Sequence, residues 1–94
     1  MSKSILQKDS ERCFLCDSEG NLEEHHIFGG NPGRRLSEHY GLKVKLCKAC
    51  HNLPPEGAHF NKDTMLRLRQ KGQEAFVKTY PTTDFESLFG KNYL

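Results

Sequence analysis

Apolar and polar side chains alternate in two short segments of the chain, and this period of two is typical of half-buried strands. In residues 42–46, leucine and valine alternate with lysine, so we expect a strand there. A weaker alternation over residues 22–28 ends in isoleucine and phenylalanine and predicts the other strand. Three glycines and a proline in residues 29–33 predict a loop after it, because these residues do not continue a strand ladder.

Helical spacing replaces this alternation in the last third of the chain. Small or apolar residues recur at that spacing, and charged residues occupy the opposite face. The recurring positions are Met65, Leu68, Gly72, Ala75, Phe76 and Thr79. We expect a helix over residues 63–79 with Asp63 as its N-cap. A second, short helix is predicted over residues 85–89, between Asp84 as N-cap and Gly90 as the stop.

Shorter helical turns are expected between the two strands and after the second one. Ser37 can cap a turn over residues 37–40, and Gly41 can end it. The segment that follows residue 46 should begin another turn, which the prolines and glycine of residues 54–57 interrupt. Together these elements predict a single small α+β domain over residues 1–94.

The composition limits the hydrophobic core. A chain of 94 residues with 35% hydrophobic residues and no tryptophan can bury only a thin core. Domains of this size usually need a cross-link, which either a metal ion or disulfides can supply. The two C-x-x-C spacings, and the lack of an apolar N-terminal segment typical of secretion, favour reduced thiols and a cytoplasmic location. No apolar run approaches the roughly 18–20 residues of a membrane span, so we expect no membrane association.

Two pairs of cysteines, Cys13 with Cys16 and Cys47 with Cys50, have the spacing of zinc ligands. Each pair places two sulfurs on one ion, and two pairs complete a tetrahedron. The long segment between the pairs becomes a loop held at both ends, which is where a cross-link stabilises most. We therefore expect a structural Zn²⁺ on these four sulfurs. A redox-active thiol pair is disfavoured, because zinc explains both motifs at once.

Histidines remain for a second site, since four sulfurs already satisfy one zinc ion. His25 and His26 are neighbours, so in a strand their side chains point to opposite faces. His51 directly follows the last cysteine, and His59 comes shortly before the predicted main helix. We expect these four side chains to converge where the first strand meets the second cysteine pair. His39 is expected to be solvated on a surface turn.

Positive charge is concentrated after the first strand and along the second. The net charge is only +2, but residues 34–48 contain five basic residues and one acidic residue. Residues 9–24 reverse this balance, with six carboxylates and one arginine. A basic stripe beside a metal site is the footprint expected for a phosphate backbone, although a merely solvated face has the same composition. The candidate phosphate contacts are Arg34, Arg35, Lys43 and Lys45.

The sequence Glu-His-His-Ile at residues 24–27, the glycine-bearing loop, and Leu-Cys-Lys-Ala-Cys-His at residues 46–51 resemble the HNH endonucleases. The chain is similar in particular to small phage-encoded HNH proteins that carry a four-cysteine zinc site. The motif-bearing stretch runs from residue 13 to about residue 61, roughly half of the chain. This resemblance implies a ββα-metal (His-Me finger) fold, in which two antiparallel strands and a helix surround one catalytic divalent ion.

The resemblance also divides the domain into three parts. Residues 11–61 would contain the zinc site and the ββα-metal motif, residues 62–94 would form helices packed over it, and residues 1–10 are expected to be flexible. The side chains expected to fill the core and to wrap over the metal-bound centre are Phe76, Phe85, Leu88, Phe89 and Tyr93.

Site residues carry over from the family one by one. His26 corresponds to the general base that activates water, a task for which neutral imidazole is suited near neutral pH. His25 and His51 correspond to ligands of the catalytic metal, and His59 to a further ligand beside the main helix. The implied catalytic ion is Mg²⁺, Mn²⁺, Ni²⁺ or Zn²⁺. Hydrolysis of DNA would leave a 5′-phosphate and a 3′-hydroxyl.

The chain departs from the family at one position. Family members carry an asparagine a few residues before the third cysteine, where this chain has glycine and leucine at residues 41–42. That asparagine fixes the loop that carries the base. Asn31, Asn52, Asn61 or His39 would have to replace it here.

The leading hypothesis is a metal-dependent HNH endonuclease that nicks or cleaves DNA with little sequence specificity of its own. So small a nuclease has few residues left to read bases, and we expect a protein partner that confers specificity, such as phage packaging or recombination machinery. The alternative hypothesis is a zinc-stabilised DNA- or protein-binding module with a vestigial nuclease site. Zinc storage or redox buffering is disfavoured, because it makes no use of His25 and His26.

Overall fold

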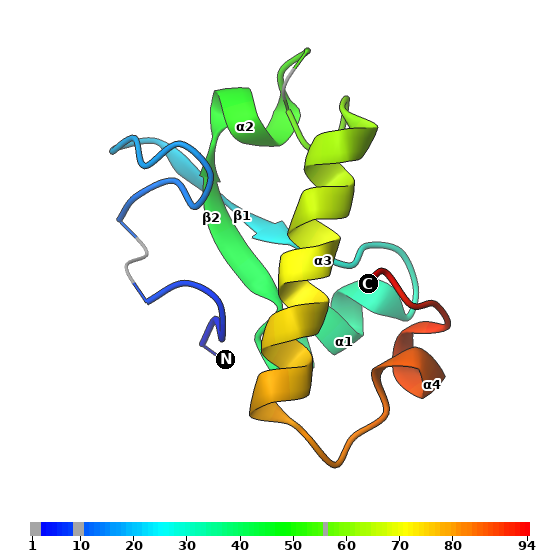
Figure 1. Ribbon diagram of the computed structural model, residues 1–94. Helices are drawn as coiled ribbons and strands as arrows, with labels where there is room; N and C mark the ends of the chain where they lie inside the picture. The colour runs from blue at the N-terminus through cyan, green and yellow to red at the C-terminus, as the bar shows by residue number, and fades with distance from the viewer. Residues whose placement is uncertain (1–2, 9–10, 56) are drawn as a thin grey trace.

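Two short strands pair as an antiparallel sheet at the centre of the computed structural model (Figure 1). Strand β1 comprises Leu22–His26 and strand β2 comprises Lys43–Cys47. The antiparallel register places His26 opposite Lys43 at one end of the sheet. Both strands that the alternation predicted are therefore present, and β2 is displaced by one residue from the prediction. The structure describes residues 3–8, 11–55 and 57–94.

Strand β1 ends two residues earlier than the predicted strand over 22–28. The N–H of Ile27 still donates to the carbonyl of Leu42 at 3.0 Å. At Phe28 the hydroxyl of Ser37 takes the place of a backbone partner on β2. It accepts from the Phe28 N–H at 3.0 Å and donates to the Phe28 carbonyl at 2.9 Å. A buried side chain thus satisfies the backbone at this point, and the ladder stops.

Helix α1 comprises Gly33–Tyr40 and begins four residues before the predicted turn. Ser37 therefore lies inside the helix and is fully buried, so the prediction that it is the N-cap is wrong. Pro32 takes the N-cap position instead. The predicted stop is confirmed, because Gly41 has a φ of +73°, a left-handed conformation that glycine adopts without strain.

Helix α2 (Lys48–Asn52) begins directly after β2, which confirms the helical turn expected there. The interruption expected over residues 54–57 follows it, and residue 56 lies outside the described residues. Beyond the gap, the N–H of Gly57 donates to the carbonyl of Leu53 at 2.7 Å and turns the chain back towards α2.

Helix α3 (Lys62–Thr79) ends at the predicted residue and begins one residue earlier than predicted. Its N-cap is Asn61, whose side-chain oxygen accepts from the N–H of Thr64 at 3.0 Å. The prediction of Asp63 as N-cap is therefore wrong, because an amide two residues earlier satisfies the free N–H groups of the first turn.

Helix α4 (Phe85–Phe89) has the predicted bounds. Asp84 is its N-cap, accepting from the N–H of Glu86 at 3.2 Å, and Gly90 is its C-cap with a φ of +77°. No helix in the described part of the chain combines the length and the apolar character needed to cross a bilayer.

Helix α3 crosses one face of the sheet, as Figure 1 shows. Leu68, Gly72 and Phe76 of its predicted apolar face are buried, whereas Thr79 is exposed. A Cβ atom on Gly72 would lie 3.2 Å from side-chain atoms of Ile27. The missing side chain thus allows the helix backbone to approach the sheet closely.

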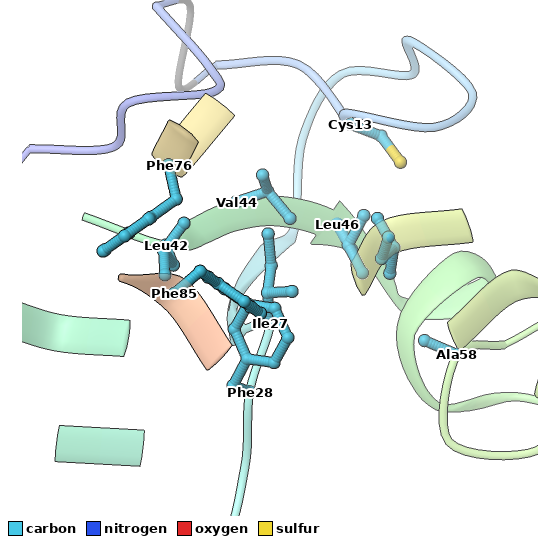
Figure 2. Packing of buried hydrophobic residues seen from close by; sticks show 10 residues of the cluster. Cys13, Ile27, Phe28, Leu42, Val44, Leu46, Ala58, Phe76 and Phe85 are labelled. Atoms are coloured by element: carbon cyan, nitrogen blue, oxygen red, sulfur yellow. The ribbon is translucent and has the colours of Figure 1, made fainter. Parts of the chain in front are cut away.

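The core lies between α3 and the face of the sheet that Val44 and Leu46 share (Figure 2). These two residues occupy alternate positions of β2, so they point to the same side. The buried hydrophobic residues are Cys13, Ile27, Phe28, Leu42, Val44, Leu46, Ala58, Leu68, Phe76 and Phe85. A thin core of this kind matches the low apolar content of the chain.

The aromatic residues of the C-terminal part surround the ring of Phe28. Ring centroids of Phe89, Phe85 and Tyr93 lie 4.7, 5.4 and 5.5 Å from that of Phe28. The prediction that these side chains fill the core is thus confirmed, and Phe89 and Tyr93 lie beside α1 and the loop that precedes it.

The N-terminal segment lies along β2. The N–H of Ile5 donates to the carbonyl of Gly41 at 2.9 Å, and the side-chain oxygen of Gln7 accepts from the N–H of Lys45 at 2.6 Å. Residues 1–10 were expected to be flexible. Of these, residues 1, 2, 9 and 10 lie outside the described residues. Residues 3–8 are attached to the sheet by these contacts.

Replacing Phe76 by alanine should lower the free energy of unfolding by about 3–5 kcal/mol, because the ring is fully buried and its loss leaves a cavity. Chemical denaturation followed by circular dichroism measures this loss. The matched control is Val77→Ala on the next, 48% exposed position, which should change stability by no more than about 0.5 kcal/mol. Equal effects of the two substitutions would contradict the described packing of α3.

Candidate metal centres and the adjoining cleft

The four cysteines lie together, although they come from two distant parts of the chain. Cys13 and Cys16 belong to the loop before β1, Cys47 ends β2, and Cys50 lies in α2. Their sulfur atoms all lie within 4.8 Å of one another. Tetrahedral zinc with Zn–S bonds of about 2.3 Å sets its sulfurs about 3.8 Å apart. The cluster is therefore compatible with a structural zinc ion.

Backbone contacts position the first cysteine pair against β2. The N–H of Cys13 donates to the carbonyl of Ser18 at 2.8 Å, which closes the loop. The N–H of Phe14 donates to the carbonyl of Lys45 at 2.8 Å, which attaches the loop to the strand that carries Cys47. No disulfide links any of the four cysteines, all of which lie in described segments. The Sγ atoms of Cys16 and Cys47 are 3.5 Å apart.

The thiols of this cluster have opposite tendencies to ionise. Hydrogen bonds from the side chain and backbone of Ser18 lower the pKa of Cys16 to about 6. Burial, together with the neighbouring sulfurs, raises the pKa of Cys50. Four thiolates so close together repel one another, and a divalent cation that binds them removes this repulsion. The electrostatics thus agree with the geometry that a structural zinc requires.

Three imidazoles converge beside the cysteine cluster. His25 lies on β1, His51 on α2, and His59 in the segment before α3, and one ring nitrogen of each lies within 4.8 Å of the others. The Nε2 atoms of His51 and His59 are 3.1 Å apart. A tetrahedral ion with metal–nitrogen bonds of about 2.0–2.1 Å sets its ligand nitrogens about 3.3 Å apart. The three rings therefore fit the ligand set of a divalent metal.

His25 carries an unsatisfied buried nitrogen in this cluster. Its Nε2 atom is buried and has no hydrogen-bond partner among the described residues, and the residue is only 3% exposed. Burial first, and then the nearby His51 and His59, lower the pKa of His25 to about 4. The ring is thus neutral near pH 7. A neutral buried imidazole with a free lone pair is a ready metal ligand.

A carboxylate fixes the orientation of His51. Its Nδ1 atom lies 2.8 Å from Oε1 of Glu23 and donates to this carboxylate, and its Nε2 atom is the nitrogen beside His59. Carboxylates commonly hold metal-binding histidines in this way. Glu23 was not among the site residues predicted from the sequence. It occupies the position two residues before His25, where strand alternation places it on the same face of β1.

Backbone hydrogen bonds connect the imidazole cluster to the cysteine cluster. The N–H of Ala58 donates to the carbonyl of Cys50 at 2.7 Å. The N–H of His59 donates to the carbonyl of His51 at 3.2 Å. The placement of the third imidazole therefore depends on the helix that carries the fourth cysteine.

His26 lies on the opposite face of β1, as the alternation along a strand requires. It was expected to converge with the other three histidines, and that part of the prediction is wrong. Its Nε2 atom lies 3.1 Å from Oε1 of Glu38 on α1 and 3.7 Å from Oε1 of Glu24. The ammonium group of Lys43 lies 2.6 Å from the other oxygen of Glu38. His26 is therefore held in a polar cluster of its own.

This second cluster has the residue types of a metal site, since it joins Glu24, His26 and Glu38 within 4.8 Å. However, the Nζ atom of Lys43 lies 2.6 Å from one Glu38 oxygen and 3.9 Å from Glu24. A cationic side chain thus already occupies the position in which a metal ion would be attracted. The cluster orients His26 and is a poor cation site.

A cleft with a volume of about 690 Å³ opens beside His26. Arg34 and Arg35 of α1 line it, and so do Glu24, Glu38 and the loop residues before the helix. Both arginines are exposed. They are therefore available to an anionic group that enters the cleft, one helical turn from the carboxylate that contacts His26.

The two lysines predicted to contact phosphate differ from the arginines in their exposure and in their partners. Lys43 is 7% exposed and its ammonium group binds Glu38, so it supports that carboxylate and does not present its charge to a phosphate. The error arises because strand alternation predicted a solvated lysine, whereas the side chain pairs with a residue from another element. Lys45 is partly exposed, and its Nζ atom lies 4.0 Å from Glu24.

None of the four residues considered as replacements for the family asparagine hydrogen-bonds to His26 within the described part of the chain. Asn61 caps α3, and the ring of His39 lies against that of Tyr40, with centroids 4.6 Å apart. The side chain of Glu38 contacts His26 instead. This contact could not be predicted from the sequence, because the predicted helix began too late to place Glu38 on one face with Arg34.

Comparison with known proteins assigns no family. A scan against protein-family models, a search of curated proteins and a search of solved structures each found no match to this chain. Membership of the HNH endonucleases therefore stays a prediction from the sequence motif.

Replacing Cys47 by serine should remove one equivalent of zinc and abolish the cooperative unfolding transition. Structural zinc contributes about 10–16 kcal/mol in small metal-binding domains, more than a domain of this size can lose. Elemental analysis and thermal melting test this. Ala49→Ser is the matched control, because it adds a hydroxyl at an exposed position between the two cysteines and should leave zinc content unchanged. A wild-type melt of the Cys47 variant would rule out the structural role.

Proposed function

We propose that this chain is a metal-dependent HNH endonuclease that hydrolyses DNA phosphodiester bonds. The observation that carries the proposal is the imidazole cluster of His25, His51 and His59, in which the buried Nε2 atom of His25 has no hydrogen-bond partner among the described residues. One ring nitrogen of each histidine lies within 4.8 Å of the others. Three nitrogens so placed are what a divalent ion with open coordination positions requires.

The four cysteines would hold a structural Zn²⁺, and the three histidines would hold the catalytic ion, as Mg²⁺, Mn²⁺, Ni²⁺ or Zn²⁺. When bound, the catalytic ion would neutralise charge on the phosphoryl group and assist the leaving oxygen. Strands β1 and β2 with helix α2 would then form the ββα-metal core, since β1 carries His25, α2 carries His51, and β2 pairs with β1 and leads into α2.

His26 is the proposed general base. It directly follows His25 in the chain, and its ring lies on the other face of β1 from the imidazole cluster. Its placement in a cleft with two arginines supports this role. A phosphate there can accept hydrogen bonds from Arg34 or Arg35, while His26 takes the proton of the attacking water. The products would be a 5′-phosphate and a 3′-hydroxyl.

Substitution of His26 by alanine should abolish plasmid nicking in the presence of Mg²⁺, Mn²⁺ or Ni²⁺. The domain should keep its fold and its metal content, because His26 is a ligand in neither metal cluster. Nicking rates, elemental analysis and circular dichroism measure these three properties. Lys71→Ala is the control, because this exposed side chain of α3 does not line the cleft beside His26.

Unaltered nicking by the His26 variant would remove this residue from the base role. If neither protein cleaves DNA with any of these metals but both still shift it in gels, the alternative holds. The chain would then be a zinc-stabilised binding module with a vestigial nuclease site.

Removing the charges of Arg34 and Arg35 together should weaken DNA binding and make it less sensitive to salt. Each phosphate contact contributes about 0.9 to the slope of log K against log salt concentration, so the slope should fall by about 1–2. Binding titrations at several salt concentrations measure it. The control replaces Lys71 and Lys78, two exposed cations on the outer face of α3, by alanine. An equal fall in both double variants would show that only net charge matters.

A further inference from the structure

Glu38 is the residue that contacts the proposed base most closely. Its Oε1 atom lies 3.1 Å from Nε2 of His26, and its Oε2 atom lies 2.6 Å from Nζ of Lys43. The carboxylate thus bridges a ring from β1 and an ammonium group from β2. Because His26 and Lys43 are opposite each other in the register, their side chains stand on the same face of the sheet.

The identity of the donor in the contact with His26 follows from the charge of Glu38. The ammonium group of Lys43 first, and then His26, lower the pKa of Glu38 to about 2, so the carboxylate is ionised at any pH near neutrality. An ionised carboxylate can only accept hydrogen bonds. The Nε2 atom of His26 must therefore carry the proton in this contact.

The other ring nitrogen is then the one with a lone pair. No hydrogen bond joins Nδ1 of His26 to another residue in the parts of the chain described here. A neutral imidazole protonated at Nε2 accepts a proton at Nδ1 only. A carboxylate that fixes the tautomer of a histidine base is a recurring device in hydrolytic enzymes on unrelated folds.

We propose that Glu38 is a positioning residue: it holds His26 in the Nε2-protonated form and leaves Nδ1 as the proton acceptor. The kinetic consequence of this inference rests on the proposed endonuclease function. The assignment of the tautomer does not depend on that function. Glu38 thereby does the work of the asparagine that the family carries and this chain lacks. Lys43 has a supporting part, because its buried charge keeps the carboxylate ionised and in place.

The position of Glu38 in helix α1 explains why its side chain can reach His26. Helix α1 begins at Gly33, so Arg34 and Glu38 are four residues apart and lie on one face of the helix. That face borders the cleft beside His26. The same turn of α1 thus supplies a cation for the proposed phosphate and an anion for the proposed base.

The decisive experiment measures the tautomer of His26 by ¹⁵N NMR on the full, metal-loaded chain labelled at histidine nitrogens, with His26→Ala to assign the signals. The wild type should show a protonated Nε2 and an unprotonated Nδ1. Glu38→Ala should give a mixture of tautomers, and Glu38→Gln should retain the wild-type form, because its amide oxygen can still accept from Nε2. A wild-type tautomer in the alanine variant would overturn the proposal.

Nicking kinetics form the second arm. Glu38→Ala should lower kcat about a hundredfold with little change in KM, and Glu38→Gln should stay within about tenfold of the wild type. The control is Glu74→Ala, an exposed carboxylate on α3, which should leave kcat unchanged. An unchanged kcat in Glu38→Ala would overturn the kinetic part of the proposal.

Glu38→Ala also leaves the buried ammonium group of Lys43 without its partner, which can unfold a domain. The double variant Glu38→Ala/Lys43→Met removes both charges and should restore the fold while kcat stays low. Recovery of the wild-type kcat in the double variant would mean that Glu38 merely neutralises Lys43, which would overturn the proposal. Should the wild type nick no DNA with any metal, the proposed function fails, and the ¹⁵N signals alone still decide whether Glu38 sets the tautomer.

Discussion

The pairing register of β1 and β2 is the constraint on which the rest of the structure depends. It sets His25 opposite Val44 and His26 opposite Lys43, and so sends one imidazole to the core face and the next to the polar face. A slip of one residue would exchange the two faces and dissolve both clusters. The short ladder alone is weak, and the cysteine cluster at the end of β2, with the first cysteine loop bonded to Lys45, resists such a slip.

Much of this fold follows from local sequence patterns. The alternation in β2, the helical spacing of α3 and the two cysteine pairs each depend on neighbouring residues only, and each was predicted close to its observed bounds. The convergence of His25, His51 and His59 was predicted as well, because strand alternation and adjacency to a cysteine fixed two of the three rings. Local sequence is sufficient where neighbouring residues determine both the secondary structure and the direction in which a side chain points.

The errors lie where an element is fixed by a partner distant in the sequence. Helix α1 begins among glycines and a proline, which favour a loop, and is held by the buried hydroxyl of Ser37 against the backbone of Phe28. Lys43 follows a strand pattern that predicts solvent exposure, yet Glu38 from another element draws it into a buried pair. Contacts of this kind have no periodic signal, and so neither the start of α1 nor the environment of His26 could be read from the chain.

The backbone bonds that join Ala58 to Cys50 and His59 to His51 have a consequence for how the protein matures. The third imidazole is held by backbone bonds to α2, and α2 begins directly after the third cysteine. If the proposed function holds, an ion bound by the four sulfurs would order α2 and so create the receptor for the second ion.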